Sequence, residues 1–280
     1  MSDATGSLAS VTVDGAQIVY RRVGKGRPLL VLNGFGATSA DWDPFFIDRL
    51  AYSNELILLN NRGIGGSTDD GQSFDIARLA DDAAHVIKAL GIERASVMGW
   101  SMGGFIAQSF AVKYADRVDK LVLLSTDPGG IEADLASPEV WSELVDTSGT
   151  PNEQARRLLF LLFPNDVEES FHREFGDIVA AARARLSAEL LNRQAAAMAA
   201  WHRNGLTSQL RKIRVPVFIA TGTEDILIPA SNALKLVNTI PGARLAQFPH
   251  GGHAFLAQYP RALADLINSF LTSGEVESGA

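Results

Sequence analysis

The chain has 280 residues, of which 46% are hydrophobic and 20% are charged, so it is long and apolar enough to bury a sizeable core. Its net charge is −7 and no cluster of Lys and Arg stands out, which argues against nucleic acid or an anionic membrane as partner. The absence of cysteine excludes disulfides, thiolate metal sites and a cysteine nucleophile. Residues 1–10 do not resemble a signal peptide and no apolar run could span a bilayer, so we expect a cytoplasmic protein.

Strand patterns alternate with helix patterns along most of the chain. The first two strands flank Asp14-Gly15, a dipeptide typical of tight hairpin turns. Later strands are mostly continuous apolar runs, which indicate a largely parallel sheet covered by helices on both faces. The predicted strands are residues 11–13, 17–22, 28–32, 55–59, 95–97, 121–124, 215–220 and 244–248, and the predicted helices are residues 76–90, 105–112, 231–237 and 262–271.

The alternation is interrupted between about residues 132 and 210, where we find no convincing strand. This stretch predicts helices at residues 138–145, 153–163, 167–185 and 188–203. It carries more aromatic side chains than isolated surface helices would, so we expect a helical insertion that buries its apolar faces against itself and the sheet. These aromatic residues are Trp141, Phe160, Phe163, Phe171, Phe175 and Trp201.

Residues 98–104, Met-Gly-Trp-Ser-Met-Gly-Gly, connect a predicted strand to a predicted helix. Within them Gly99, Ser101 and Gly103 form a G-x-S-x-G pattern, which builds a tight turn that strains the serine backbone and exposes its hydroxyl. Ser101 could instead be an ordinary helix N-cap between loop glycines. The flanking strand and helix favour the tight turn, which presents Ser101 as a nucleophile and directs the Met102 N–H at the group that it attacks.

Five polar residues lie at or just past the ends of predicted strands. Because the carboxyl ends of parallel strands meet at one edge of the sheet, where ligands bind, we expect these side chains to surround one site. They are Asn33, Ser101, Asp127, Asp225 and His253.

Four motifs together resemble the α/β-hydrolase family over nearly the whole chain. They are Asn61-Arg62-Gly63-Ile64-Gly65, Gly99-Trp100-Ser101-Met102-Gly103-Gly104, Gly222-Thr223-Glu224-Asp225 and Gly252-His253. Within the family, the chain is most similar to the small esterases, enol-lactonases and cofactor-free haloperoxidases. The resemblance implies an α/β fold with a mostly parallel, doubly wound sheet. It also implies a core domain of residues 1–130 and 211–280, and a helical cap of residues 131–210 inserted after the sixth strand.

The resemblance further implies a serine nucleophile supported by a base and an acid, in the chain order of the family. Ser101 attacks the substrate, His253 takes its proton, and Asp225 orients the imidazole. The backbone N–H groups of Phe35 and Met102 are the expected oxyanion donors. No metal and no organic cofactor is implied. The candidate substrate contacts are Trp100, Asn33 and Leu227.

Two of these assignments have rivals in the chain. His250 lies three residues before His253, but the glycine before His253 and the apolar residue after it favour His253 as the base. Asp127 follows the strand after the serine turn, where some family members place their carboxylate, so it competes with Asp225 as the acid. The other histidines lie in predicted helices and are expected at the surface. They are His85, His172 and His202.

We expect hydrolysis of a small or medium, largely apolar carboxylic ester or lactone through an acyl-Ser101 intermediate. Relatives with the same three residues suggest two alternatives, which are hydrolysis of a carbon–carbon bond and metal-free halogenation through a peracid. A third hypothesis is a ligand-binding protein on this scaffold, with slow or no turnover. In each case the expected partner is a small molecule, and a homo-oligomer is an open alternative.

Overall fold

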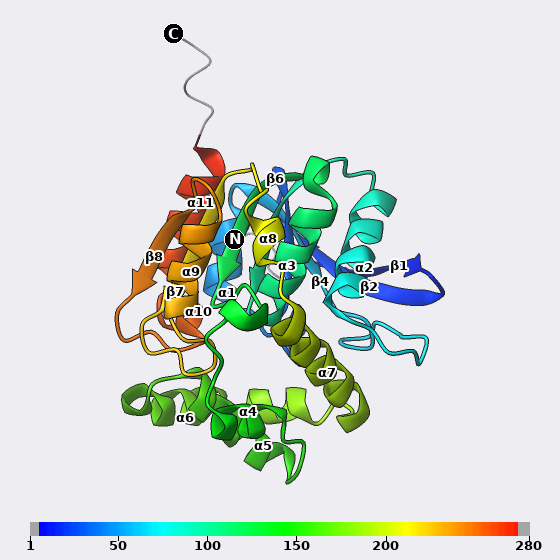
Figure 1. Ribbon diagram of the computed structural model, residues 1–280. Coiled ribbons are helices and arrows are strands. Elements are labelled where there is room, and N and C mark those ends of the chain that lie inside the picture. The colour runs from blue at the N-terminus through cyan, green and yellow to red at the C-terminus, as the bar shows by residue number, and fades with distance from the viewer. Residues whose placement is uncertain (1–5, 274–280) are drawn as a thin grey trace.

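The computed structural model describes residues 6–273. An eight-stranded sheet crosses its centre, with helices packed on both faces and further helices at one end (Figure 1). The strands are β1 (Leu8–Val13), β2 (Ala16–Val23), β3 (Arg27–Leu32), β4 (Asn54–Leu59), β5 (Ala95–Trp100), β6 (Val118–Leu124), β7 (Val217–Gly222) and β8 (Arg244–Phe248). Their order across the sheet is β1-β2-β4-β3-β5-β6-β7-β8.

The sheet is mostly parallel, as the sequence predicts. β1 pairs antiparallel with β2 and β2 pairs antiparallel with β4, whereas the other neighbouring strands run parallel. The predicted hairpin turns at Asp14 and Gly15, with φ of 45° and 82°. Two successive residues with positive φ match the right-handed twist of the strands they join, which is why this dipeptide suits the turn.

Helices cover both faces of the sheet. Apart from the four longer helices between β6 and β7 described below, they are α1 (Pro44–Ala51), α2 (Ile76–Ala89), α3 (Met102–Lys113), α8 (Thr207–Leu210), α9 (Ser231–Thr239), α10 (Phe255–Gln258) and α11 (Pro260–Thr272), with 3-10 turns at Ala115–Arg117 and Gly130–Glu132. Side chains of α2, α3 and α9 pack on one face, and those of α1 and α11 on the other. Along β3, Leu30 faces the first layer and Leu29 and Val31 face the second, so residues 28–32 of the strand are all apolar.

Helix α1 is absent from the sequence prediction, although its start signals are present. The Asp43 carboxylate accepts a hydrogen bond from the Phe46 N–H at 2.8 Å, and Pro44 occupies the first helical turn. An Asp cap followed by Pro is a common way to begin a helix. The helix has only eight residues, so its apolar spacing covers little more than two turns.

Four helices form the insertion between β6 and β7, close to the predicted bounds. They are α4 (Pro138–Val145), α5 (Pro151–Leu162), α6 (Asn165–Arg183) and α7 (Ala188–Asn204). α4, α5 and α6 lie together below the sheet, and α7 runs from them toward the core (Figure 1). Of the aromatic side chains in this stretch, Phe163 and Trp201 are buried, whereas Phe160 is 49% exposed. The domain bounds at residues 131 and 210 stay a prediction.

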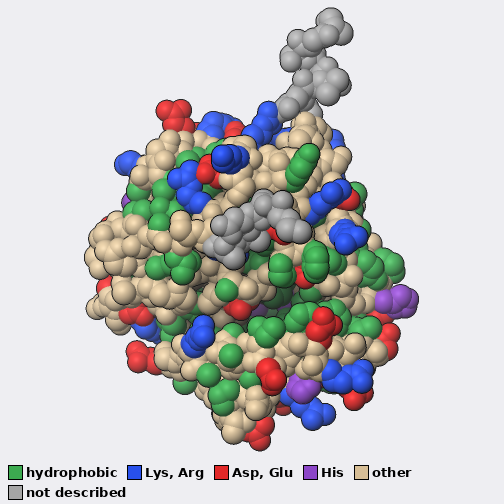
Figure 2. Space-filling model, turned by 180° about the vertical axis from the view of Figure 1, so that it is seen from behind, with side chains coloured by type: hydrophobic (Ala, Val, Ile, Leu, Met, Phe, Trp, Pro, Cys, Tyr) green, Lys and Arg blue, Asp and Glu red, His purple; other side chains and the backbone are tan. Residues whose placement is uncertain are grey.

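The surface mixes charged and apolar side chains. On the face opposite that of Figure 1, hydrophobic side chains lie between the core and the helices below it, with Lys, Arg, Asp and Glu side chains interspersed around them (Figure 2). Among the helices of residues 6–273, none is both long and apolar enough to cross a membrane.

Candidate active site

Ser101 stands at the sharp turn between β5 and α3. Its backbone has φ 58° and ψ −125°, a conformation that L-residues rarely adopt, and its N–H donates to the Leu124 carbonyl at 2.9 Å. The turn brings α3 against the end of β3. A Cβ on Gly103 would stand 2.1 Å from the Leu32 carbonyl oxygen, so only glycine permits this approach. The predicted strand, tight turn and helix are therefore all present.

Two backbone donors near Ser101 are free. The N–H groups of Phe35, in the loop after β3, and of Met102, the first residue of α3, donate to no group of the described chain. The first N–H groups of a helix have no partner within the helix, so they are available to a bound oxygen. Ser101 and Phe35 line the same cavity.

Asp225 and His253 form a buried pair in the loops after β7 and β8. Asp225 Oδ2 lies 2.8 Å from His253 Nδ1, and the two side chains are 0% and 3% exposed. Asp225 Oδ1 accepts the N–H groups of Leu227 at 3.0 Å and Ile228 at 2.8 Å, which fixes the carboxylate plane. His253 lines the cavity together with Ser101, while no hydrogen bond joins these two described residues.

The rival residues lie in other pairs. His250 Nδ1 is 2.7 Å from Glu224 Oε1, but the histidine side chain is 81% exposed and does not line the cavity. Asp127 is buried and contacts His202, with Oδ2 3.2 Å from Nε2. The expectation that His202 lies at the surface is wrong, because its side chain is 16% exposed and lines the cavity.

The cavity has a volume of about 750 Å³ and lies between the sheet and the inserted helices. Trp100 and Leu227, two predicted substrate contacts, line it. Asn33 does not, because its amide donates to the Leu59 carbonyl at 2.6 Å and accepts from the Trp42 indole at 2.6 Å. Its side chain holds the loop in place and is fully buried. Apolar side chains dominate the wall, among them Phe105, Trp141, Leu159, Phe163, Phe171 and Val179.

A sequence model described as alpha/beta hydrolase fold matches residues 27–258, which include the serine turn and the Asp225–His253 pair. The chain belongs to the α/β-hydrolase family. This confirms the family that the four sequence motifs resemble.

Other α/β-hydrolases match this one over nearly its full length. RutD from Azorhizobium caulinodans, whose name provisionally assigns it carbamate hydrolysis, is 30% identical over 94% of this chain and 97% of its own. A non-heme haloperoxidase from Rhodococcus erythropolis is 27% identical over 93% of this chain and 96% of its own. The solved structure of the esterase RhEst1 from Rhodococcus sp. ECU1013 matches with a TM-score of 0.82 at 25% identity, covering 95% and 99% of the two chains.

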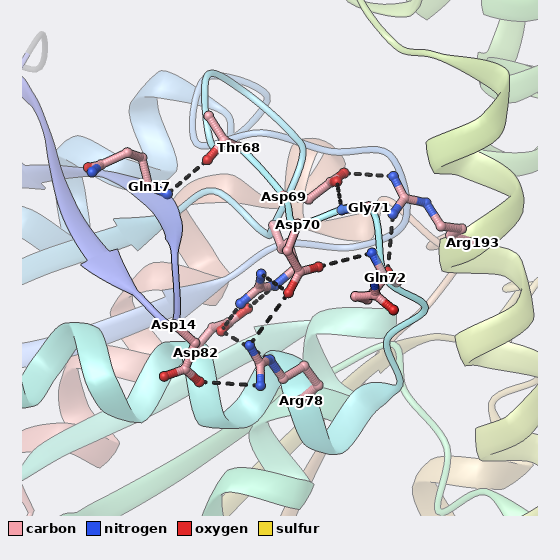
Figure 3. Close-up of polar contacts among 11 residues, drawn as sticks. Asp14, Gln17, Thr68, Asp69, Asp70, Gly71, Gln72, Arg78, Asp82 and Arg193 are labelled. Atoms are coloured by element: carbon pink, nitrogen blue, oxygen red, sulfur yellow. Dashed lines mark hydrogen bonds and ion pairs between the residues drawn. The ribbon is translucent and has the colours of Figure 1, made fainter.

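The loop after β4 joins the core of this α/β-hydrolase to its inserted helices. Arg62 in this loop donates from Nε and Nη2 to the Asp82 carboxylate on α2, at 2.9 and 2.6 Å, and both side chains are almost wholly buried. On the outer side of the loop, Arg193 of α7 donates to Asp69 at 2.6 Å and to the Gln72 carbonyl at 3.1 Å (Figure 3).

The next residue of α7 contacts the loop after β3. Gln194 is fully buried, and its Oε1 accepts the Gly36 N–H at 2.9 Å. Gly36 directly follows Phe35, whose N–H is free. α7 of the hydrolase therefore holds, through adjacent side chains, both the loop after β4 and the loop that carries one of the free donors.

Sequence reasoning gave no functional role to two polar residues of the cavity wall, His202, which it placed at the surface, and Arg183. Arg183 lies on α6, at helical spacing from the buried Gly176 and Ala180. A charged residue on the buried face of an amphipathic helix is a signal that could have identified Arg183. For His202, no such signal is visible, because its partner Asp127 lies 75 residues away in the chain.

Proposed function

We propose that this α/β-hydrolase hydrolyses a carboxylic ester or lactone, with Ser101 as nucleophile, His253 as base and Asp225 as the acid that orients it. The observation that supports this most is the geometry around one cavity. A strained turn exposes the Ser101 hydroxyl beside two free N–H groups, and the buried Asp225–His253 pair lines the same space.

In the proposed reaction, Ser101 Oγ attacks the carbonyl carbon while His253 Nε2 accepts its proton. The carbonyl oxygen becomes an oxyanion and accepts hydrogen bonds from the N–H groups of Phe35 and Met102. His253 then protonates the departing alcohol oxygen, which leaves an acyl-Ser101. A water molecule, deprotonated by the same imidazole, attacks the acyl group, and Ser101 is released with a carboxylic acid.

The shape of the cavity supports a medium-sized, largely apolar substrate. About 750 Å³ falls within the range of pockets that bind drug-sized molecules. The aromatic and aliphatic side chains of α4, α5 and α6 form much of the wall, so we infer that these helices select the acyl or alcohol group. An esterase among the similar solved structures supports ester chemistry as well.

Formation of a peracid is a second candidate, because one relative is a non-heme haloperoxidase. In that reaction, hydrogen peroxide replaces water in attacking the acyl-Ser101, and a peracid leaves in place of the carboxylic acid. The peracid oxidises bromide to hypobromous acid, which brominates a phenol. Bromination that requires bromide, peroxide and acetate together would therefore favour this candidate over simple hydrolysis.

Labelling with a fluorophosphonate, followed by peptide mass mapping, tests the proposed nucleophile. We expect modification of Ser101 in the wild type and none in Ser101→Ala, with kcat for a 4-nitrophenyl ester lowered by about 10⁶ in the variant. His253→Ala should also resist labelling. His250→Ala is the matched control and should label normally, because its exposed pair with Glu224 lies outside the site. A folded wild type that stays unlabelled would contradict the proposal.

A further inference from the structure

Arg183 places a buried positive charge in the wall of the cavity. It is the last residue of α6 and is 8% exposed, an unusual degree of burial for an arginine. Its Nη1 lies 3.3 Å from the point where a Cβ on Gly36 would stand, so the guanidinium is beside the loop that carries the Phe35 N–H. Both Arg183 and Gly36 line the cavity.

No carboxylate of residues 6–273 neutralises this charge. The Arg183 side chain makes one hydrogen bond, from Nε to Gln154 Oε1 at 3.3 Å. The Gln154 amide is itself fixed by donating to the carbonyls of Thr147 and Gly149, at 2.9 and 3.2 Å. Nη1 and Nη2 have no hydrogen-bond partner among the described residues, and they keep accessible surface.

A buried arginine without a carboxylate partner opposes folding, so we look for a function that accounts for it. Burial lowers the pKa of Arg183, and the charge of Arg157 acts in the same direction. Arginine stays protonated in proteins even so. A buried cation without a counter-ion costs free energy, which a bound anion would recover.

The acidic residues of the same wall are already engaged. Asp127 contacts His202 and accepts the Gly129 N–H at 2.7 Å, while Asp134 pairs with Lys235. Asp43 caps α1. The other acid is Asp41, which accepts from Thr38. Arg203 also lines the cavity, but it is exposed. Among residues 6–273, Arg183 is therefore the buried arginine that lines this cavity and has terminal nitrogens without a hydrogen-bond partner.

We propose that Arg183 binds a carboxylate of the substrate, so that the natural substrate of this site is an ester or lactone that also carries an acidic group. The two free Nη atoms match the two oxygens of a carboxylate, the geometry in which arginine binds anions best. The inference rests on the proposed ester or lactone chemistry for its reaction, but the anion site itself is independent of it.

Paired substrates test the inference directly. One pair is mono(4-nitrophenyl) adipate and its methyl ester, which places the charge on the acyl side. The other is 4-acetoxybenzoate and its methyl ester, which places it on the alcohol side. We expect the wild type to prefer the charged member of at least one pair by kcat/KM. In Arg183→Gln this preference should fall by about 10- to 100-fold, mainly through KM.

Two variants serve as comparisons. Arg183→Lys keeps the charge but not the two-pronged geometry, so it should restore part of the preference. Arg185→Gln removes an exposed arginine two residues further along the chain and should leave the preference unchanged. A wild type that prefers neither charged ester would overturn the inference. So would a preference that survives in Arg183→Gln.

A binding measurement separates this inference from the proposed reaction. We expect hexanoate, titrated calorimetrically, to bind the wild type at least ten times more tightly than it binds Arg183→Gln. Hexan-1-ol should not distinguish the two proteins. If no ester is hydrolysed, the proposed reaction fails while hexanoate still tests the anion site. Equal affinities, or no hexanoate binding to the wild type, would overturn the inference.

Thermal stability supplies a further readout. If the charge serves a ligand and not the fold, Arg183→Gln should keep or raise the Tm of the free protein, because a buried unpaired cation is removed. A lower Tm together with an unchanged preference for the charged ester would identify Arg183 as a packing residue and overturn the inference.

Discussion

Replacing Asp225 by asparagine changes one atom and should disable the base without disturbing the fold. Oδ1 accepts two backbone N–H groups, from Leu227 and Ile228, at 3.0 and 2.8 Å. The asparagine oxygen should keep this position. In the reverse orientation the amide NH2 group would face these two backbone N–H groups, and each buried donor left unpaired costs about 1–3 kcal/mol of stability. The amide NH2 group then takes the place of Oδ2, which lies 2.8 Å from His253 Nδ1 in the wild type.

A donor at this place reverses the tautomer of the imidazole. His253 Nδ1 must then accept a hydrogen bond, so the proton of the neutral ring moves to Nε2, the atom that has to take the proton of Ser101. In serine proteases, the same exchange lowers kcat by about 10⁴. At about 1.36 kcal/mol for each factor of ten, this is a barrier higher by roughly 5 kcal/mol.

Steady-state hydrolysis of 4-nitrophenyl butyrate measures the effect, with circular dichroism to confirm folding. Glu224→Gln is the matched control, since it removes the same charge from the neighbouring residue and affects only the exposed pair with His250. It should retain kcat within about threefold, as expected for a surface charge. If Asp225→Asn keeps activity within tenfold of wild type, the assignment is wrong. A 10⁴-fold loss in Asp127→Asn instead would identify that residue as the acid.

Two further predictions concern stability and pH. Arg62→Met should lower the free energy of unfolding in urea by about 3–5 kcal/mol, because it removes both hydrogen bonds to Asp82, whose pKa burial already raises, and leaves this buried carboxylate with the more distant Arg78 at 3.8 Å. A loss below 1 kcal/mol would contradict this. Burial, together with the hydrogen bond to Asp81, raises the pKa of Tyr114 to about 12. The raised pKa contributes stability that is fully present below about pH 10 and is lost as pH rises through about 12. Absorbance at 295 nm should show a step there that Tyr114→Phe removes, and persistence of the step would refute the assignment.

The sheet and the serine turn could be predicted because their causes are local. Residues 28–32 and 56–59 are apolar throughout because helices cover both faces of the sheet, and this pattern can be read without knowing which helices they are. The turn at Ser101 requires small neighbours within two residues in either direction, so its pattern is complete within a short stretch. The same holds for the hairpin at Asp14-Gly15.

The parts that sequence reasoning missed depend on neighbours distant in the chain. His202 lies in a helix, as predicted. Its side chain lines the cavity, where it contacts Asp127, a residue that is distant in the chain. Asn33 lies at the end of a strand, the position from which we predicted a substrate contact. Its amide turns inward because the Trp42 indole and the Leu59 carbonyl satisfy it there. Pattern alone places such residues on an element but does not orient them.

The two contacts of α7 divide the insertion into a fixed part and a variable part. Because Arg193 and Gln194 fasten α7 to the loops after β4 and β3, this helix belongs mechanically to the core. α4, α5 and α6 make neither of these two contacts, yet they supply much of the cavity wall. We therefore expect that substitutions in these three helices can alter which substrates fit while leaving the position of the Phe35 N–H undisturbed. New specificities could accumulate among the side chains of these helices, provided that the Leu162 carbonyl of α5 keeps accepting the Ala254 N–H beside His253 at 3.0 Å.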